Sequence, residues 1–266
     1  MTATIEITST ENPQIKEARK LQRRRQRYRD RLFLVEGVRL VRDALESGAV
    51  IQRLFYAPAM IADNEAAQTL VAQCTAQQVA CFACTPDVLN TLTETITPQG
   101  IVAVVVMPAL ALPSPLHFTL ILDQVRDPGN AGTLLRTAAA AGVDAVIFGP
   151  ETVDPYNDKV LRAGMGAHFR LPLRNCPTWS AIQPLLAPEQ RCFVAEAGAP
   201  LRYDNVDWTQ PCALIIGGEA AGASHETTSF AQRVAIPMHS QVESLNAAIA
   251  GSIILFEAAR QRRTDR

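Results

Sequence analysis

Short apolar and β-branched runs alternate with helical patterns along the first hundred positions. The pattern predicts strands at 33–37, 51–56, 79–83 and 101–107, and helices at 38–46, 66–74 and 86–92. Strands that alternate with helices are typical of an α/β domain. We therefore expect an α/β domain over residues 1–107.

Residues 108–117 separate this region from a second α/β pattern. They contain three prolines and no charged residue, which is typical of a linker. Beyond them the pattern predicts strands at 119–123, 144–148, 192–195, 213–216 and 233–237, and helices at 133–141 and 245–260. The last helix is apolar nearly all round, which predicts a buried helix. We expect a second domain over residues 118–266.

No segment predicts a membrane span or an export signal. Four prolines interrupt the longest run without charge, residues 95–122, and residues 1–16 have no apolar core. We expect a cytoplasmic protein that binds no membrane. Six cysteines are too few for a disulfide scaffold, and the Cys81–Cys84 pair has no second pair at a spacing typical of zinc sites, so we expect no metal.

The charges are distributed unevenly. The chain has 25 Lys and Arg against 26 Asp and Glu, and a formal net charge of −1 argues against nucleic-acid binding. Residues 16–31, however, contain nine basic and two acidic residues, a net charge of +7 that leaves −8 for the rest. Apolar residues in this segment fit one stripe of a single basic helix. Such a helix is either a solvated surface or a surface that faces an anionic partner.

Three loops of the second domain combine small and polar residues, and each follows a predicted strand. They contain Asn130, with Arg136 in the next helix; Gly217, Gly218, Glu219 and Gly222; and Ile236, Pro237, Ser244, Leu245 and Asn246. Arg136 falls in the first two turns of its predicted helix. Ligands of open α/β sheets bind beyond the carboxyl ends of the strands, so these loops are the candidate site. Each loop also fits a simpler role as a helix cap or tight turn.

Neither a GxGxxG nor a GxxxxGK[ST] motif is present, so the common nucleotide-phosphate loops are not supported. The three loops, in their order, instead resemble the three successive motifs of the SpoU/TrmH-type RNA ribose methyltransferases. The segment from Asp154 to Gly166 also resembles this family, as do Asn12–Lys16 and Phe33–Gly37 in the first domain. The chain departs from the family at Gly218, where Asn is usual, and at Asp158, where Pro is common.

The resemblance implies an L30e-like RNA-binding domain followed by a SPOUT methyltransferase domain, whose C-terminal segment threads a trefoil knot. It implies a homodimer that binds S-adenosylmethionine and methylates a ribose 2′-hydroxyl of RNA, with 23S rRNA as the first choice. Catalysis would involve Arg136, Asn130, Glu219, Ser244 and Asn246. The cofactor would contact Ile216, Gly217, Gly218, Ile236, Pro237, Ser244 and Leu245. The RNA would contact Lys16, Arg19, Lys20, Arg23, Arg24, Arg25, Arg27 and Arg162.

Three alternatives stay open. The substrate could be tRNA, although family members with this N-terminal domain mostly act on large-subunit rRNA. A non-catalytic RNA-binding protein is the second, and the retained Asn130, Arg136 and Ser244–Asn246 argue against it. A small-molecule enzyme with a nucleotide cofactor is the third, and the basic segment and the missing GxGxxG argue against it.

Overall fold

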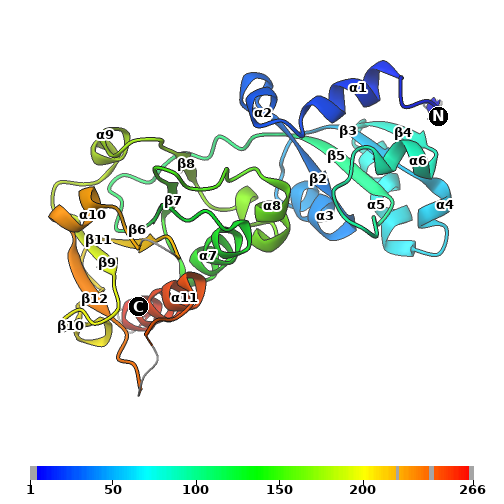
Figure 1. The fold of residues 1–266 in the computed structure, drawn as a ribbon. Coiled ribbons are helices and arrows are strands. Elements are labelled where there is room, and N and C mark those ends of the chain that lie inside the picture. Colours follow the sequence, from blue (N-terminus) through cyan, green and yellow to red (C-terminus); the bar gives the residue numbers. More distant parts are fainter. Residues whose placement is uncertain (1–4, 220–221, 240–242, 264–266) are drawn as a thin grey trace. The chain divides into compact units, whose positions relative to one another are not determined.

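The structure is a computed structural model that describes residues 5–219, 222–239 and 243–263. The chain forms two compact units, residues 1–108 and 109–266, and each is a sheet with helices packed on it (Figure 1). Most of the segment expected to be a linker belongs to the second unit. There Leu116 is buried, and the carbonyl of Leu110 accepts a hydrogen bond from Arg174 at 3.1 Å.

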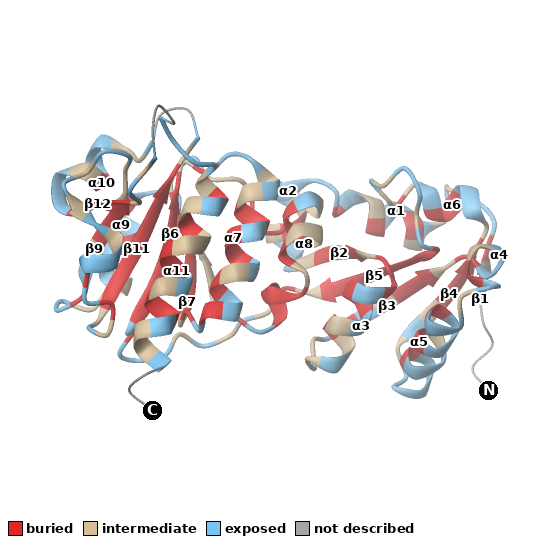
Figure 2. Cartoon of the chain, turned by 90° about the horizontal axis from the view of Figure 1, so that it is seen from below, coloured by how far each residue is buried: buried red, intermediate tan, exposed pale blue. Residues whose placement is uncertain are grey.

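The first unit is a five-stranded mixed sheet with the strand order β1-β4-β3-β5-β2. Its strands are β1 (Ile5–Ile7), β2 (Leu32–Glu36), β3 (Ile51–Tyr56), β4 (Ala80–Cys84) and β5 (Ile101–Val106). Its helices are α1 (Pro13–Lys20), α2 (Arg24–Asp30), α3 (Val38–Glu46), α4 (Pro58–Ile61), α5 (Glu65–Ala76) and α6 (Pro86–Asn90). Helices α1 and α6 cover one face and α3 and α5 the other (Figure 2).

The basic segment is two helices, so the prediction of one continuous helix over 16–31 is wrong. Helix α1 ends at Lys20, Arg23 has an extended backbone, and α2 begins at Arg24. The buried Arg27 holds the bend, because its Nη1 donates to the carbonyls of Leu21 at 3.0 Å and Gln22 at 2.8 Å. These carbonyls lie beyond the end of α1 and would otherwise lack a partner in the helix.

The second unit is a seven-stranded parallel sheet with the order β10-β12-β9-β11-β6-β7-β8. Its strands are β6 (Phe118–Asp123), β7 (Ala145–Phe148), β8 (Leu173–Asn175), β9 (Arg191–Ala195), β10 (Leu201–Arg202), β11 (Cys212–Gly217) and β12 (Gln232–Ala235). Its α-helices are α7 (Pro128–Ala141), α8 (Asp158–Gly164), α9 (Trp179–Ile182), α10 (His225–Phe230) and α11 (Ala247–Arg263).

Every residue of β6 and β11 is buried, because helices cover both faces of this sheet. Side chains of one parity, such as Leu120 and Leu214, face α7, α8 and α11. The side chains that alternate with them, such as Ile121 and Ile215, point to the other face of the sheet, toward α9 and the end of α10. Gly132 lets α8 approach the backbone of α7, because a Cβ there would lie 2.5 Å from the Cβ of Ala163.

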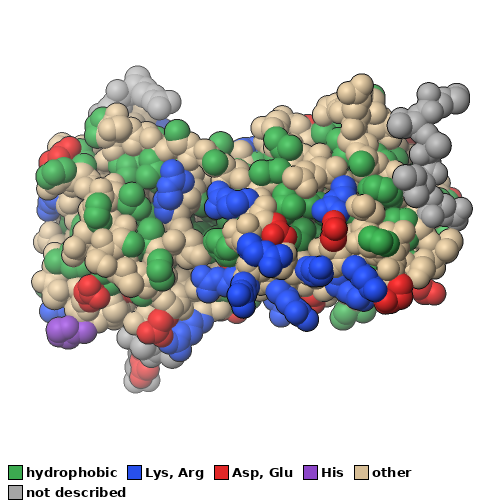
Figure 3. All heavy atoms as spheres, turned by 90° about the horizontal axis from the view of Figure 1, so that it is seen from above, with side chains coloured by type: hydrophobic (Ala, Val, Ile, Leu, Met, Phe, Trp, Pro, Cys, Tyr) green, Lys and Arg blue, Asp and Glu red, His purple; other side chains and the backbone are tan. Residues whose placement is uncertain are grey.

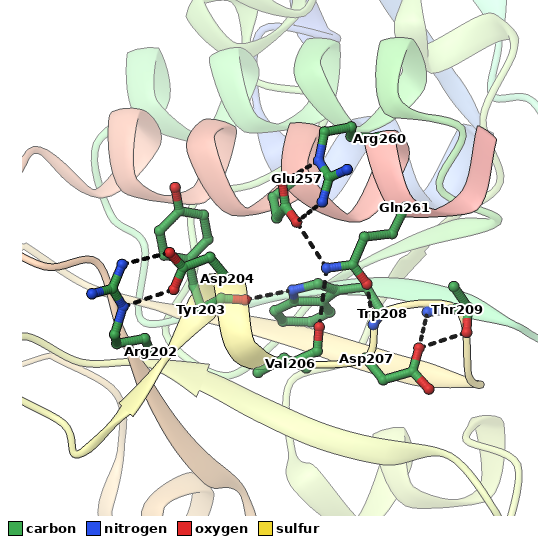
Figure 4. A network of polar contacts seen from close by, with 10 residues as sticks. All are labelled: Arg202, Tyr203, Asp204, Val206, Asp207, Trp208, Thr209, Glu257, Arg260 and Gln261. Carbon is green, nitrogen blue, oxygen red and sulfur yellow. Dashed lines mark hydrogen bonds and ion pairs between the residues drawn. The ribbon is translucent and has the colours of Figure 1, made fainter. Parts of the chain in front are cut away.

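Helix α11 is fixed at its C-terminal end by polar contacts with residues 201–209 (Figure 4). Gln261 accepts from the amide of Trp208 at 2.9 Å and donates to the carbonyl of Val206 at 3.0 Å. The helix is not buried all round as expected, since Ile249 is 51% and Phe256 46% exposed. No helix among the described residues is long and apolar enough to cross a membrane.

A buried histidine lies beside α8. The Nε2–H of His168 donates to the carbonyl of Pro155 at 2.8 Å, and its ring lies 5.9 Å from that of Tyr156. Burial lowers the pKa of His168 to about 4, because the charged imidazolium would lose its hydration.

We expect His168 to make unfolding depend on pH. The unfolded chain takes up a proton at His168 near pH 6.5, whereas the folded chain accepts it only near pH 4. The contribution of neutral His168 to the free energy of unfolding is therefore complete above about pH 6.5 and is lost as the pH falls toward 4. This difference corresponds to about 3 kcal/mol. Urea unfolding of His168→Gln across this range should show a smaller loss than wild type. The exposed His225→Gln is the control, and equal pH profiles for His168→Gln and wild type would contradict the assignment.

Candidate functional site

The candidate loops follow β6, β11 and β12, whose carboxyl ends lie at one edge of the parallel sheet. The helix after β6 begins five residues earlier than predicted. The Asp127 side chain caps α7 by accepting from the amide of Asn130 at 2.7 Å, and Pro128 occupies the first helical position. Asn130 is therefore in the first turn, and Arg136 is in the third turn rather than in the first two.

Three predicted site residues form one hydrogen-bonded chain. Asn130 Nδ2 donates to Glu219 Oε1 at 2.6 Å, and Asn246 Nδ2 donates to Asn130 Oδ1 at 3.0 Å. Asn246 Oδ1 also accepts from the amides of Ala248 and Ile249, so Asn246 caps α11. The chain thus joins all three loops by side-chain contacts, although its members are far apart in sequence.

A cavity of about 690 Å³ lies at this edge of the sheet. Six of the seven predicted cofactor residues line it, namely Ile216, Gly217, Gly218, Ile236, Ser244 and Leu245, together with Glu219 and Asn246. Pro237, Asn130 and Arg136 are not among its lining residues. The sequence analysis did not single out Ala195, Glu196, Ala197, Thr228, Met238, Ala247, Ala250 and Ile254, which also line it. Of these residues, Glu196 could have been found from the sequence, because it is a polar residue directly after the strand predicted at 192–195.

The glycines of the second loop allow close backbone contact. Gly218 and Gly222 exchange two backbone hydrogen bonds, of 2.9 and 3.0 Å. A Cβ at Gly218 would lie 2.4 Å from the carbonyl oxygen of Gln124, and one at Gly217 would lie 2.2 Å from the amide nitrogen of Ala223. Gly218 therefore suits this backbone, in which any Cβ at position 218 would require the carbonyl of Gln124 to shift.

A buried carboxylate anchors the same loop. Asp123 is fully buried at the end of β6, and its Oδ2 accepts from the amide of Ser224 at 2.8 Å and the hydroxyl of Thr227 at 2.6 Å. Trp179 Nε1 donates to the Ser224 hydroxyl at 3.3 Å. Sequence reasoning assigned Asp123 no role. An acidic residue at the end of an apolar strand could have indicated that its side chain has a buried partner.

The predicted RNA-contacting residues lie mainly on α1 and α2. Lys and Arg side chains gather over these helices in Figure 3. Lys16, Lys20, Arg23, Arg24 and Arg25 are exposed, Arg19 is half-buried, and Arg27 is buried in the bend. Arg162 lies in the second unit and forms an ion pair with Asp158 at 2.9 Å.

No group of three or more metal-ligating side chains occurs among the residues that the structure describes. All six cysteines are free, and burial raises the pKa of the Cys84 thiol to about 11. The described part of the chain therefore supplies no obvious ligand set, and the cavity walls are apolar, hydroxyl, amide and carboxylate groups.

Comparison with known proteins connects this geometry to a family. The model of the SpoU rRNA Methylase family matches residues 117–256, and the model of the MRM3-like substrate binding domain matches residues 12–103. The 23S rRNA (guanosine(2553)-2′-O)-methyltransferase RlmP of Bacillus subtilis is 34% identical, over 94% of this chain and 98% of its own. The mitochondrial rRNA methyltransferase 3 of Homo sapiens is 33% identical, over 87% of this chain and 68% of its own.

Two solved structures are similar over nearly the whole chain. The AdoMet-bound rRNA methyltransferase from Sinorhizobium meliloti has a TM-score of 0.82 and 33% identity, covering 97% of this chain and 98% of its own. The SpoU methyltransferase AviRb from Streptomyces viridochromogenes, in complex with AdoMet, has a TM-score of 0.82 and 31% identity, covering 96% of this chain and 100% of its own.

We expect Asn130→Asp to make the site sensitive to pH. The substitution replaces the Nδ2 donor by a carboxylate oxygen that faces Glu219 Oε1, 2.6 Å away in the wild type. Two carboxylates this close raise the folded-state pKa of one of them, so stability should fall as the pH rises from about 5 to about 8. Asn130→Ala should lower the free energy of unfolding by about 1 kcal/mol at both pH values.

Urea unfolding at the two pH values tests this expectation. Asn157→Asp is the matched control, because Asn157 caps α8 and accepts from the amide of Lys159, where a carboxylate is favourable. If both Asn→Asp variants respond to pH in the same way, the contact with Glu219 does not govern the behaviour of Asn130.

Proposed function

This chain belongs to the SpoU rRNA methylase family, and we therefore propose that it methylates a ribose 2′-hydroxyl of 23S rRNA with S-adenosylmethionine as methyl donor. The observation that carries the proposal is the chain Glu219–Asn130–Asn246, which joins the three motif loops at the cavity. The substrate follows the Bacillus subtilis relative, which is similar over nearly its whole length.

The cavity fits the cofactor in size and in chemistry. A volume of about 690 Å³ is within the range of small-molecule sites. Apolar side chains of Ile216, Ile236 and Leu245 suit adenine, and the backbone of Gly217 and Gly218 is accessible to polar groups. When bound, the cofactor would supply an activated methyl group: a C–O bond to the ribose oxygen would replace the S–CH₃ bond, whose electron pair would stay on sulfur, and the hydroxyl proton would leave to solvent.

The protein's own residues would align the two reactants. We assign Glu219, Asn130 and Asn246 to positioning, because they hold one another across the loops, and Ser244 to contact at the rim of the cavity. Arg136 is exposed and has no ion pair among the described residues. An arginine stays protonated in proteins, so Arg136 would hold the RNA phosphate and polarise the 2′-hydroxyl rather than remove its proton.

The exposed face of α11 supports a homodimer. Ile249 and Phe256 are seven residues apart, on one side of the helix, and about half of each side chain is exposed. Exposed apolar residues grouped in this way are typical of an interface. We infer that this face pairs with a second copy in the cytoplasm. The trefoil knot, which the resemblance to the family implies, also belongs to this proposal.

Light scattering should give a mass near twice 28.9 kDa for the wild type. Ile249→Glu with Phe256→Glu should shift it toward one chain, because charges would be buried in the interface. The same change at the exposed Thr133 and Ala139 of α7 is a control for added negative charge. A wild-type monomer would rule out the dimer.

Arg136→Ala should abolish methyl transfer while leaving the affinity for S-adenosylmethionine nearly unchanged, because Arg136 does not line the cavity. A labelled-methyl assay on rRNA, with calorimetry of cofactor binding, tests this. Arg191→Ala is the control, since Arg191 lies at the amino end of β9, away from the carboxyl ends of the strands where the candidate loops lie. Full activity of Arg136→Ala would remove the role assigned to it.

Charge reversal at Arg23, Arg24 and Arg25 to Glu should weaken RNA binding and flatten its dependence on salt, because fewer phosphates are then neutralised. The expected loss is about tenfold or more at physiological salt. Arg39→Glu with Arg42→Glu on α3, at the opposite face of the first sheet, is the control. An unchanged salt slope in the triple variant would place the RNA elsewhere.

A further inference from the structure

The charges in the cavity wall have one sign. Among the lining residues that the structure describes, two carry a titratable side chain, and these are Glu196 and Glu219. The other described lining residues are apolar residues, glycines, Ser244, Thr228 and Asn246.

The backbone of Glu196 is held by the sheet. It follows the last residue of β9, and its amide donates to the carbonyl of Val234 on β12 at 2.9 Å. Its carboxylate pairs with Arg233 at 3.3 Å, but both side chains are about half exposed and Arg233 does not line the cavity. Water screens such a pair strongly, so it neutralises Glu196 only in part.

Glu219 has a neutral partner. Its Oε1 accepts from the side-chain Nδ2 of Asn130 at 2.6 Å, and no cation pairs with it among the described residues. A hydrogen bond from an amide leaves the full negative charge in place. The wall as a whole therefore favours a ligand that carries positive charge.

We propose that Glu196 makes this cavity select its ligand by charge, so that it binds cationic S-adenosylmethionine more tightly than the neutral product S-adenosylhomocysteine. This inference rests on the proposed function. S-adenosylmethionine has a sulfonium, an ammonium and a carboxylate group, a net charge of +1. Loss of the methyl group leaves a thioether and a net charge of zero. The transfer thus removes the charge that the wall attracts, and product binding weakens as a result of the reaction.

The size of the effect follows from Coulomb's law. For an assumed separation of about 7 Å between a carboxylate and a unit positive charge, at an effective dielectric constant between that of a protein surface and water, the attraction changes affinity by about three- to tenfold. Glu196 is selected for the test because it lies outside the three motif loops and outside the hydrogen-bonded chain of Glu219, Asn130 and Asn246.

Calorimetry of the full-length protein with three probes tests the proposal. The probes are S-adenosylmethionine, S-adenosylhomocysteine, and sinefungin, in which an ammonium group replaces the methylated sulfonium centre. The wild type should bind the two cationic probes about fivefold more tightly than the neutral one. Glu196→Gln should weaken both cationic probes about threefold and change the neutral one little.

Two further variants separate charge from structure. Arg233→Gln removes the cation that pairs with Glu196, so it should strengthen the cationic probes by about twofold, in the opposite direction. Glu189→Gln is the matched control, because Glu189 is exposed and does not line the cavity. Equal changes for all three probes in Glu196→Gln, or equal affinities in the wild type, would overturn the proposal.

The wild type alone gives a second measurement that needs no variant. Raising the salt concentration from about 50 to about 500 mM should narrow the preference for the cationic probes, because salt screens partly exposed charges. A preference that does not change with salt would also overturn the proposal. If none of the three probes binds the wild type, the proposed function itself fails, which is a different result from binding without discrimination.

Discussion

The parallel pairing of β6 with β11 determines where the loops of the second unit can meet. Six residue pairs, from Phe118 with Cys212 to Asp123 with Gly217, are in register, and both strands are buried throughout. The strands therefore end at the same level. Asp123, at the end of β6, can then accept hydrogen bonds from Ser224 and Thr227 in the segment after β11. The hydrogen bond from Asn130 to Glu219 joins the same two segments. A slip by one residue would turn Asp123 to the other face and break these contacts.

Local signals in the sequence were enough for the elements that have clear boundaries. Strand β3 and helix α3 occur at the predicted residues. Ile51 and the Leu54–Tyr56 run favour the strand, and the flanking Gly37 and Gly48 mark the ends of the helix. The cavity was also foreseen in outline, since small and polar residues after strands predict a site at the sheet edge. The start of α7 was placed too late, because Pro128 and Gly129 were interpreted as loop residues although Pro favours the first helical turn.

Contacts between distant residues account for most of what the sequence left out. The bend between α1 and α2 depends on Arg27 and two specific carbonyls, which no periodicity reveals. Strands as short as β1, β8 and β10 exist only because a neighbouring strand pairs with them. The exposure of Ile249 and Phe256 was missed for another reason: an apolar pattern does not distinguish a helix covered by its own domain from one that a second chain would cover.

The order of the site residues along the chain affects how the protein is made. The first unit is complete at Pro108, whereas Ala247, Ala250 and Ile254 close the cavity near the other end. At the usual speed of the ribosome the intervening residues take roughly ten to thirty seconds to translate, and domains generally fold from the N-terminus. A nascent chain therefore carries the proposed RNA-binding surface well before its cavity exists. A product of premature termination before Ala247 would retain the residues of α1 and α2 proposed to contact RNA and would lack three residues that line the cavity.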